Sequence, residues 1–376
     1  MSIQIKTVTS KKDLKTFVRF ANKLYEGNKY YVPSMPFDDM DTFNPEENGA
    51  YDFSKAELYL AYKDGKVAGR VAAIINTRAN EAWKVNQVRF GWIDFIDDME
   101  VSGALLNAVS EFGRKHGMTQ IVGPLGFTDF DPEGMMVEGY DRICTMALIY
   151  NHPYYPEHMK KHGYVKETGW KEYRITIPEK LPEKYDRVAE LVHEKYDLKV
   201  KKFTTRQIRK DGYGRKFFEL INNTYCDLYG FSVLSDKQID KYVNLYLSLI
   251  VAKMLTFIED KDGNLIAAGV SIPSLAEALQ KCRGEIFPFG WWHLLKAMFL
   301  KRSDTVELLL IGVLPEWQRK GVVALLFQDL MKTYNSMGFK YAETNAMLED
   351  NVKIHAMFEP FEKEIHKARW VFGKEL

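Results

Sequence analysis

The chain has 376 residues, of which 46% are hydrophobic, so it can bury a large core, and its length favours two domains over one. Its 52 Lys and Arg residues against 51 Asp and Glu residues give a formal net charge of +1. That balance excludes a global electrostatic field of the kind that attracts nucleic acid or an anionic membrane. Cys144, Cys226 and Cys282 form no CxxC pair and leave an odd thiol under any pairing, which favours a reducing compartment.

Neither a targeting segment nor a membrane-spanning segment is evident in the sequence. The stretch from Met1 to Lys6 lacks the apolar run of a signal peptide. No uninterrupted apolar run approaches the roughly 20 residues that a spanning helix needs. We therefore expect a cytoplasmic protein.

The first half of the chain alternates strand and helix patterns. Ser10 is a good N-cap for an amphipathic helix, and residues 63–66, with the sequence Lys-Asp-Gly-Lys, form a tight turn between two apolar strands. Gly117 is a natural left-handed cap for the helix before it. The predicted strands are 3–8, 58–62, 67–75, 88–95 and 121–122, and the predicted helices are 11–24 and 100–115.

The second half repeats this order. Its predicted strands are 198–203, 254–258, 265–272, 306–313, 341–345 and 366–372, and its predicted helices are 207–229, 236–251, 322–336 and 351–359. The repeat predicts two domains, 1–178 and 183–376, with residues 178–182 as the linker region.

The most informative stretch runs from Leu308 to Leu326, an apolar strand followed by a short basic turn and the start of a helix. Such a turn is common, but the free amides and positive dipole end of the helix suit an anion, and Arg319 and Lys320 add charge. The order Gln318-x-x-Gly321-x-Val323 resembles the pyrophosphate-binding turn of the GCN5-related N-acetyltransferase (GNAT) superfamily. Val323 stands where that pattern has Gly or Ala.

The resemblance implies an α/β (α+β) fold with two tandem GNAT-like domains, each a mixed central sheet flanked by helices. It also implies acyl-CoA as co-substrate, bound by the second domain, and no metal. The residues expected to bind acyl-CoA are Ile311, Gly312, Val313, Gln318, Arg319, Lys320, Gly321, Val322, Val323, Ala324 and Asn351. The equivalent turn of the first half, residues 97–100, is acidic and should repel a phosphate.

Acyl transfer to an amine requires a base that removes a proton from the amine. Glu307 and Glu343, on neighbouring predicted strands, are the candidate catalytic bases, with an exposed surface carboxylate as the alternative for Glu307. Asn351 matches the Asn of the superfamily's later motif and is also a good helix N-cap. Phe358 stands where that motif often has a proton-donating Tyr, and His355 is expected to be a surface or core histidine.

The loop from Gly123 to Asp141 is rich in Gly, Pro, aromatic and acidic residues. Its acidic residues do not meet the register of a calcium loop. We expect the loop to shape a substrate pocket in which Asp129, Glu138 or Tyr140 holds an amine or hydroxyl.

A narrower resemblance covers most of the chain. Residues 123–124, 133–141, 154–155, 162–166, 287–291 and 348–351, together with the Lys367-x-Arg369 pair, are similar to a tandem acetyltransferase-like family that includes bacterial ceramide synthases. This resemblance implies transfer of a fatty acyl group from acyl-CoA to the amine of a long-chain sphingoid base.

The apolar, aromatic segment from Ile286 to Lys301 agrees with a lipid substrate. It is too short to span a bilayer but suits a membrane-surface helix, an acyl-chain channel or a buried core helix. We expect Trp291, Trp292 and Phe299 to line the path of the lipid, and peripheral membrane contact would follow.

The sequence thus predicts an acyl-CoA-dependent N-acyltransferase whose partners are acyl-CoA and an amine acceptor, with a lipid as one form of that acceptor and no nucleic acid. The alternatives are a small-amine acetyltransferase, an aminoacyl-transferring enzyme and a non-catalytic acyl-CoA or lipid-binding protein. Acceptor identity, acyl chain length and oligomeric state are left open.

Overall fold

The computed structural model describes residues 3–300 and 302–376, so Met1, Ser2 and Lys301 lie outside the described residues. The chain divides into two compact units, each assembled from separate parts of the sequence. Unit 1 comprises Met1–Lys171, Ala276–Leu294 and His366–Leu376, and unit 2 comprises Glu172–Leu275 and Leu295–Ile365. Residues 276–294 and 366–376, from the second half of the sequence, therefore belong to the first unit.

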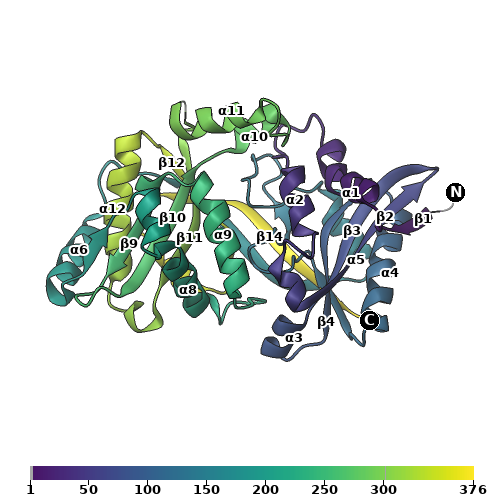
Figure 1. Cartoon of the computed structure of the whole chain (residues 1–376), viewed down its shortest axis with the longest axis horizontal. Helices are drawn as coiled ribbons and strands as arrows, with labels where there is room; N and C mark the ends of the chain where they lie inside the picture. The colour runs from purple at the N-terminus through teal and green to yellow at the C-terminus, as the bar shows by residue number, and fades with distance from the viewer. Residues whose placement is uncertain (1–2, 301) are drawn as a thin grey trace. The chain divides into compact units, whose positions relative to one another are not determined.

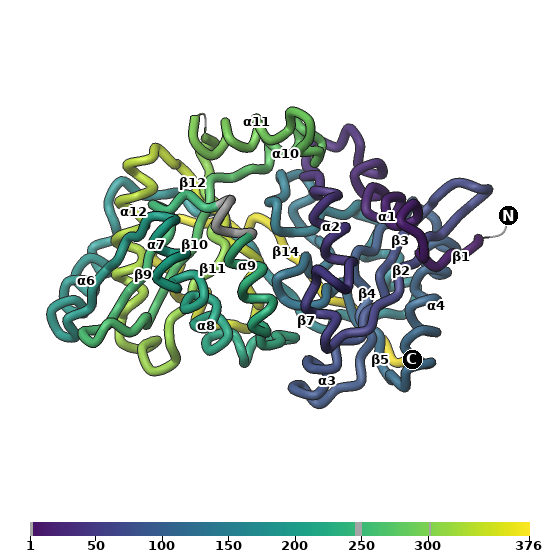
Figure 2. The backbone as a smooth tube through the Cα atoms, in the orientation of Figure 1, coloured from purple at the N-terminus to yellow at the C-terminus, as the bar shows by residue number. Residues whose placement is uncertain are grey.

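The sheet of unit 1 has the strand order β1-β2-β3-β4-β5-β14. Its pairs are antiparallel except for β4 and β5, which run parallel. The C-terminal strand lies beside β5 and also pairs with β6, as the yellow trace among the blue strands in Figure 2 shows. The strands are β1 (Ile3–Thr7), β2 (Ser54–Lys63), β3 (Lys66–Asn76), β4 (Gln87–Phe95), β5 (Gln120–Gly123), β6 (Met135–Glu138) and β14 (Lys363–Glu375).

Helices cover both faces of this sheet (Figure 1). The apolar side chains of α4, such as Leu105 and Val109, pack in one core with Val71 and Phe90. A second core contains Phe17 of α1 together with a different set of apolar residues from the strands. The helices of this unit are α1 (Lys11–Leu24), α2 (Pro36–Thr42), η1 (Gly49–Asp52), α3 (Thr77–Trp83), α4 (Met99–Lys115), α5 (Tyr154–Lys161), α10 (Ala276–Cys282) and α11 (Gly290–Leu295).

The sheet of unit 2 has the strand order β8-β9-β10-β11-β12-β7. The C-terminal end of β7 forms the outer strand of this sheet, beside β12. Only β11 and β12 are parallel among its paired strands with a described register. The strands are β7 (Val165–Thr176), β8 (Lys199–Lys201), β9 (Leu255–Glu259), β10 (Leu265–Pro273), β11 (Thr305–Val313), β12 (Tyr341–Thr344) and β13 (Met347–Leu348), which pairs with β7.

Helix α12 packs on β9 and β10 and against α6, and α8 packs on β10 and β11. The buried side of α12, which includes Leu326 and Leu330, contributes to two apolar cores of the unit. The helices are α6 (Glu183–Tyr196), α7 (Thr205–Lys210), α8 (Tyr213–Tyr225), α9 (Asp236–Leu249), η2 (Ala252–Met254), the π-helical turn η3 (Lys296–Leu300), η4 (Pro315–Trp317), α12 (Val322–Met337) and α13 (Val352–Met357).

The predicted fold class is confirmed, and so are most predicted elements. One prediction is wrong: the single helix at 207–229 is two helices, because Gly212 adopts a left-handed conformation with φ of +74° between α7 and α8. The predicted linker, residues 178–182, lies within unit 2 and leads directly into α6, a helix that we did not predict. None of the helices in the described part of the chain is both long and apolar enough to cross a membrane.

Candidate active site

In unit 2 the parallel strands β11 and β12 pair and then part. Their register runs from Thr305 opposite Tyr341 to Leu308 opposite Thr344, where β12 ends. Strand β11 continues to Val313 along β10, and the register of that pair shifts opposite Leu309, which marks a bulge. Beyond Leu308, β11 therefore presents a backbone edge that β12 no longer covers.

Tyr225, at the end of α8, lies on this uncovered stretch of β11. Its hydroxyl donates to the carbonyl of Ile311 at 3.1 Å and accepts from the amide of the same residue at 3.4 Å. Burial raises the pKa of Tyr225 to about 12, so the phenol keeps its proton at neutral pH. We did not predict this residue, because the end of an amphipathic helix gives no sign of which strand it faces.

Gly312 allows α8 to approach β11 this closely. A Cβ atom at this position would lie 3.2 Å from Cδ1 of Ile221 and 3.2 Å from Oγ1 of Thr224, both on α8. These distances are shorter than most Cβ contacts, so a side chain here would displace the helix that positions Tyr225.

The predicted anion-binding turn joins β11 to α12. Gly321 has a φ of +79° and precedes the helix, and no side chain caps the first turn. The amides of Val322 and Val323 therefore lack an intrahelical acceptor; Val322 is fully buried, and Val323 is partly exposed. Gly321 has a second role, since a Cβ atom there would lie 2.7 Å from Cγ1 of Val188 on α6.

The polar side chains of the turn are arranged around this helix end. Gln318 donates to the carbonyl of Val313 at 3.2 Å and accepts from Lys353 at 3.1 Å. The ammonium group of Lys320 lies 4.1 Å from the centre of the Trp317 ring. In this turn the side chains of Gln318 and Lys320 thus have partners within the unit, and Arg319 is an exposed cation.

The branched side chain of Val323 does not stand free over the helix end. It is partly buried and packs against both apolar cores of unit 2. The neighbouring side chains of Val322 and Ala324 are buried. The departure from Gly or Ala at this position is thus taken up by core packing.

The two candidate bases are direct neighbours, because Glu307 of β11 is in register with Glu343 of β12. The preceding residues Val306 and Ala342 belong to the core that contains α12, so alternation directs both carboxylates to the opposite face of the sheet. Their side chains are buried, with residue exposures of 2% and 4%. The alternative of an exposed surface carboxylate at Glu307 does not hold, because the strand is buried from its first residue, Thr305.

The two carboxylates have different partners. Glu307 accepts a hydrogen bond of 2.7 Å from the hydroxyl of Ser274. Glu343 forms an ion pair of 2.6 Å with Arg174, whose guanidinium group also lies 4.1 Å from the centre of the Tyr341 ring. Arg174 thus holds Glu343, and the hydroxyl of Ser274 is one partner of Glu307.

The later motif is built as a structural corner. The side chain of Asn351 accepts from the amide of Ile354 at 3.2 Å and caps α13. Nε2 of His355 lies 2.9 Å from the carbonyl of Leu348, so it carries the proton, and Nδ1 accepts from the hydroxyl of Tyr173 at 2.9 Å. His355 is thus fully engaged in structural bonds.

Phe358 is a core residue. It is 4% exposed, and its ring centre lies 5.7 Å from that of Phe327. The position that often carries a proton-donating Tyr in the GNAT superfamily is therefore filled here by apolar packing.

The equivalent helix start in unit 1 is occupied by the protein itself. Asp98 is the N-cap of α4 and accepts from the amides of Glu100 at 2.9 Å and Val101 at 3.2 Å. Lys63 pairs with the same carboxylate. The amides that would receive a phosphate already have an acceptor.

Of the predicted substrate residues, Trp291 and Trp292 contact each other, with ring centres 6.0 Å apart. In unit 1, the hydroxyl of Tyr140 donates to the carbonyl of Met136 at 2.7 Å, Glu138 is exposed on β6, and Asp129 is partly buried. Among the described residues, no group of three or more His, Cys, Asp or Glu side chains is placed to hold a metal ion. The aromatic residues predicted to line the lipid path are all surface residues: Trp291 is 43%, Trp292 is 50% and Phe299 is 51% exposed.

Comparison with known proteins places the fold. No model of a known protein family matches the chain. It is 26% identical over 384 residues to protein YghO of Escherichia coli (strain K12), covering 99% of this chain and 95% of that protein. It is 23% identical over 380 residues to the bacterial ceramide synthase of Caulobacter vibrioides (strain NA1000 / CB15N), covering 97% and 95%.

Solved structures agree on a tandem GNAT fold. A tandem GNAT protein from the clavulanic acid biosynthesis pathway aligns over 100% of this chain and 98% of its own, with a TM-score of 0.57 and 12% identity. A GCN5-related N-acetyltransferase from Sphaerobacter thermophilus aligns over 99% and 95%, with a TM-score of 0.52 and 11% identity. The whole chain thus has the architecture that its sequence motifs predicted.

Proposed function

We propose that the protein is an N-acyltransferase that takes an acyl group from acyl-CoA and transfers it to an amine. The observation that carries this proposal is the open edge of β11, which ends at an uncapped helix start flanked by the exposed cation Arg319. An extended, amide-containing arm can pair with such an edge, where it would replace the hydroxyl of Tyr225 on the backbone groups of Ile311, while phosphates bind at the start of α12. The similarity to the tandem GNAT fold supports the same reading.

We take Glu307 as the candidate base that accepts the proton of the amine. Protonation of Glu343 would break its ion pair with Arg174, whereas protonation of Glu307 leaves the hydrogen bond from Ser274 possible. Both carboxylates lie directly before the point where the strands part, which suits a base for an acceptor at the open edge. We assign Glu343 and Arg174 to positioning.

Tyr225 is the candidate acid that replaces the phenol missing at Phe358. A departing thiolate needs a proton, and the donor must be protonated at the working pH. The raised pKa of Tyr225 meets that condition, and its hydroxyl lies on the backbone groups of Ile311 at the open edge.

The acceptor that we propose is a long-chain amine. The relative from Caulobacter vibrioides is named as a ceramide synthase. The segment around α11 exposes several large apolar side chains. Phe287 is 81% exposed and Phe289 is 78% exposed, and Trp291 and Trp292 follow them in the sequence. Exposed aromatic residues of this kind suit contact with a lipid or with a membrane surface.

Turnover tests the proposal. Release of free CoA thiol would be followed with long-chain and short-chain amines across acyl-CoAs from acetyl-CoA to palmitoyl-CoA. Glu307→Gln should lower kcat by about 100-fold or more, as loss of a general base does. Glu362→Gln, at an exposed carboxylate of the same unit, is the matched control and should leave kcat unchanged.

The panel also separates the alternatives. Preference for acetyl-CoA and small amines would indicate a small-amine acetyltransferase instead. The buried Phe358 favours a second candidate, a non-catalytic acyl-CoA-binding protein. Saturable binding of acyl-CoA without thiol release by the wild-type protein would support that candidate and contradict catalysis.

A further inference from the structure

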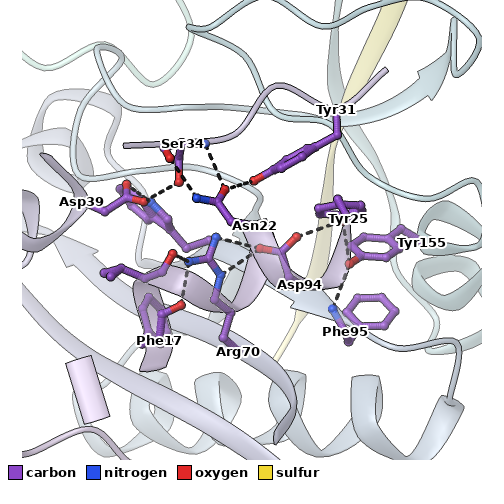
Figure 3. Close-up of polar contacts among 12 residues, drawn as sticks. Phe17, Asn22, Tyr25, Tyr31, Ser34, Asp39, Arg70, Asp94, Phe95 and Tyr155 are labelled. Carbon is purple, nitrogen blue, oxygen red and sulfur yellow. Dashed lines mark hydrogen bonds and ion pairs between the residues drawn. The ribbon is translucent and has the colours of Figure 1, made fainter. Parts of the chain in front are cut away.

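Unit 1 contains a cavity of about 90 Å³ whose lining includes none of the predicted site residues. It is bounded by α1, the segment after it, α2, β3, β4 and the residues around 146–151. Its lining combines tyrosines and apolar side chains with three charged residues, Asp39, Arg70 and Asp94 (Figure 3). A water molecule takes about 30 Å³ in the liquid, so the cavity has room for about three waters or the head of a small polar molecule.

A neutral ion pair forms one wall of the cavity. Nε and Nη2 of Arg70 each lie 2.8 Å from Oδ2 of Asp94, and both residues are 4% exposed. Nη1 of Arg70 donates to the carbonyl of Phe17 at 2.8 Å. The guanidinium group is thus fully directed toward Asp94 and the backbone of α1, as Figure 3 shows.

A chain of hydroxyl groups completes that wall. Tyr25 donates to Oδ1 of Asp94 at 3.0 Å, and its oxygen lies 2.9 Å from that of Tyr155. Because the single proton of Tyr25 goes to the carboxylate, Tyr155 is the donor between the two phenols, and it accepts from the amide of Phe95 at 2.9 Å. Asp94 therefore has an arginine and a phenol as partners and is compensated.

Asp39, on the other side of the cavity, is not compensated by a cation. Oδ2 accepts from the hydroxyl of Ser34 at 2.8 Å, and Oδ1 accepts from Nε1 of Trp92 at 3.3 Å. Within residues 3–300 and 302–376, no Lys, Arg or His forms an ion pair with this carboxylate. Asp39 lines the cavity and is partly exposed.

The backbone is shaped to bring Trp92 to Asp39. Trp92 has a φ of +45°, which is unusual for a residue with a side chain, and the register of β3 and β4 shifts at this point. The indole therefore contributes a donor to the carboxylate and an aromatic face to the cavity, where Tyr25 and Tyr31 add further rings. Aromatic faces next to a carboxylate are the usual surroundings of a bound organic ammonium ion.

We propose that this cavity is a binding site for the head of an amino alcohol, with its ammonium group on Asp39 and its hydroxyl among the polar groups around the tyrosines. The charges of Arg70 and Asp94 cancel each other. The cavity therefore carries one net negative charge, that of Asp39, which a monovalent cation would balance. Burial raises the pKa of the Asp39 carboxyl, although Arg70 opposes this, as expected for a carboxylate that lacks a counter-ion.

The position of the cavity in the fold supports this assignment. Strands β4 and β5 pair from Gln87 to Arg89 of β4 and then part, as β11 and β12 do in unit 2. In both units a tyrosine hydroxyl binds the backbone beyond that point: Tyr155 at Phe95, and Tyr225 at Ile311. Unit 1 thus carries a polar, anionic cavity at the place in its sheet that corresponds to the candidate active site of unit 2.

This inference is independent of catalysis and of CoA. It shares with the proposed function only the class of ligand, an amine, because an amine acceptor is an ammonium ion at neutral pH. Failure of thiol release would leave the cavity assignment intact, and failure of amine binding would leave the acyl-CoA site intact.

The test is calorimetric binding of 2-amino-1,3-propanediol to the full chain without CoA. Glycerol is the matched neutral probe, since it has the same shape with a hydroxyl in place of the ammonium group. We expect the amine to bind at least tenfold more tightly than glycerol, as for a partly desolvated charge pair. Asp39→Asn, which keeps the acceptor for Ser34, should remove that preference, while Asp41→Asn, at an exposed position of the same helix, should not.

Two results would overturn the proposal. One is equal binding, or no binding, of both probes by the wild-type protein, a comparison that needs no variant to fold. The other is an Asp39→Asn protein that has native circular dichroism and still prefers the amine over glycerol.

Discussion

At the scale of single residues, the hydroxyl of Tyr225 should matter for turnover and not for the fold. We expect Tyr225→Phe to lower kcat by about 100-fold with little change in KM for acyl-CoA, because a general acid contributes to the chemical step. Tyr185→Phe is the control, since it removes a comparable hydroxyl that donates to the carbonyl of Met357 at 2.7 Å. Equal kcat values for the two variants would exclude Tyr225 as the acid.

The partly buried carboxyl of Asp131 should make stability depend on pH. Burial raises its pKa to about 7 from the usual 3.8, opposed by hydrogen bonds from the amides of Thr128 and Phe127. The folded state therefore holds this proton more tightly than the unfolded chain, and the resulting stability is full below about pH 4 and is lost as the pH rises through 7.

Asp131→Asn should remove that dependence. We expect the free energy of unfolding of the wild-type protein to fall by about 1–4 kcal/mol more than that of the variant between pH 4 and pH 8. Urea titrations at several pH values measure the difference. Parallel pH profiles for the two proteins would show that Asp131 has an ordinary pKa.

Individual polar residues were the hardest to place from the sequence. Glu307 and Glu343 were identified as neighbours, because parallel strands with similar patterns align such residues. Arg70, Asp94 and Asp39 were not identified, because their partners come from elements far apart in the chain. Sequence periodicity carries no information about such long-range pairs.

At the scale of elements, the turn into α12 should bind the phosphates of CoA. Val323→Asp places a carboxylate in the first turn of the helix, as Glu100 does at α4 in unit 1. We expect it to weaken CoA binding by more than tenfold, because the carboxylate repels the phosphate and competes for the same amides. Val323→Asn has the same size and polarity without the charge, so it controls for lost packing.

A weaker effect of Val323→Asp than of Val323→Asn on the Kd for CoA would contradict this role of the turn. Gly321→Val is a poor test of the same idea. Its Cβ atom would meet Val188 of α6, so the variant should lose thermal stability whether or not it binds CoA.

Elements were predicted well where local chemistry decides them. The capping role of Ser10, the left-handed Gly117 and the hairpin at Asp64 and Gly65 are all present in the structure. The break at Gly212 was missed, because one glycine within a long amphipathic pattern is compatible with a continuous helix.

At the scale of the whole molecule, unit 1 depends on a distant part of the chain. The C-terminal strand β14 pairs with β5 and β6 in unit 1, and Lys367, Arg369, Val371 and Phe372 are at most 1% exposed. Repeats in the sequence indicated two domains, but no local pattern shows which sheet a terminal strand joins. The end of the chain is therefore part of the first unit's core.

Removal of residues 366–376 should consequently unfold unit 1. We expect loss of its cooperative transition in thermal unfolding and rapid proteolysis of residues 1–171, since β5 and β6 would lose their partner strand. Removal of residues 1–7 is the control, because β1 pairs only with β2 among the described strands and lies at the edge. Equal tolerance of both deletions would contradict this account of the fold.

The central claim is that the chain catalyses formation of an amide between an acyl group and a long-chain amine. Mass spectrometry of a reaction with palmitoyl-CoA and a long-chain amino alcohol tests it most directly. The account predicts an N-acylated product that forms in step with free CoA and is lost in Glu307→Gln. Saturable binding of palmitoyl-CoA with no amide product from any amine tested would contradict it.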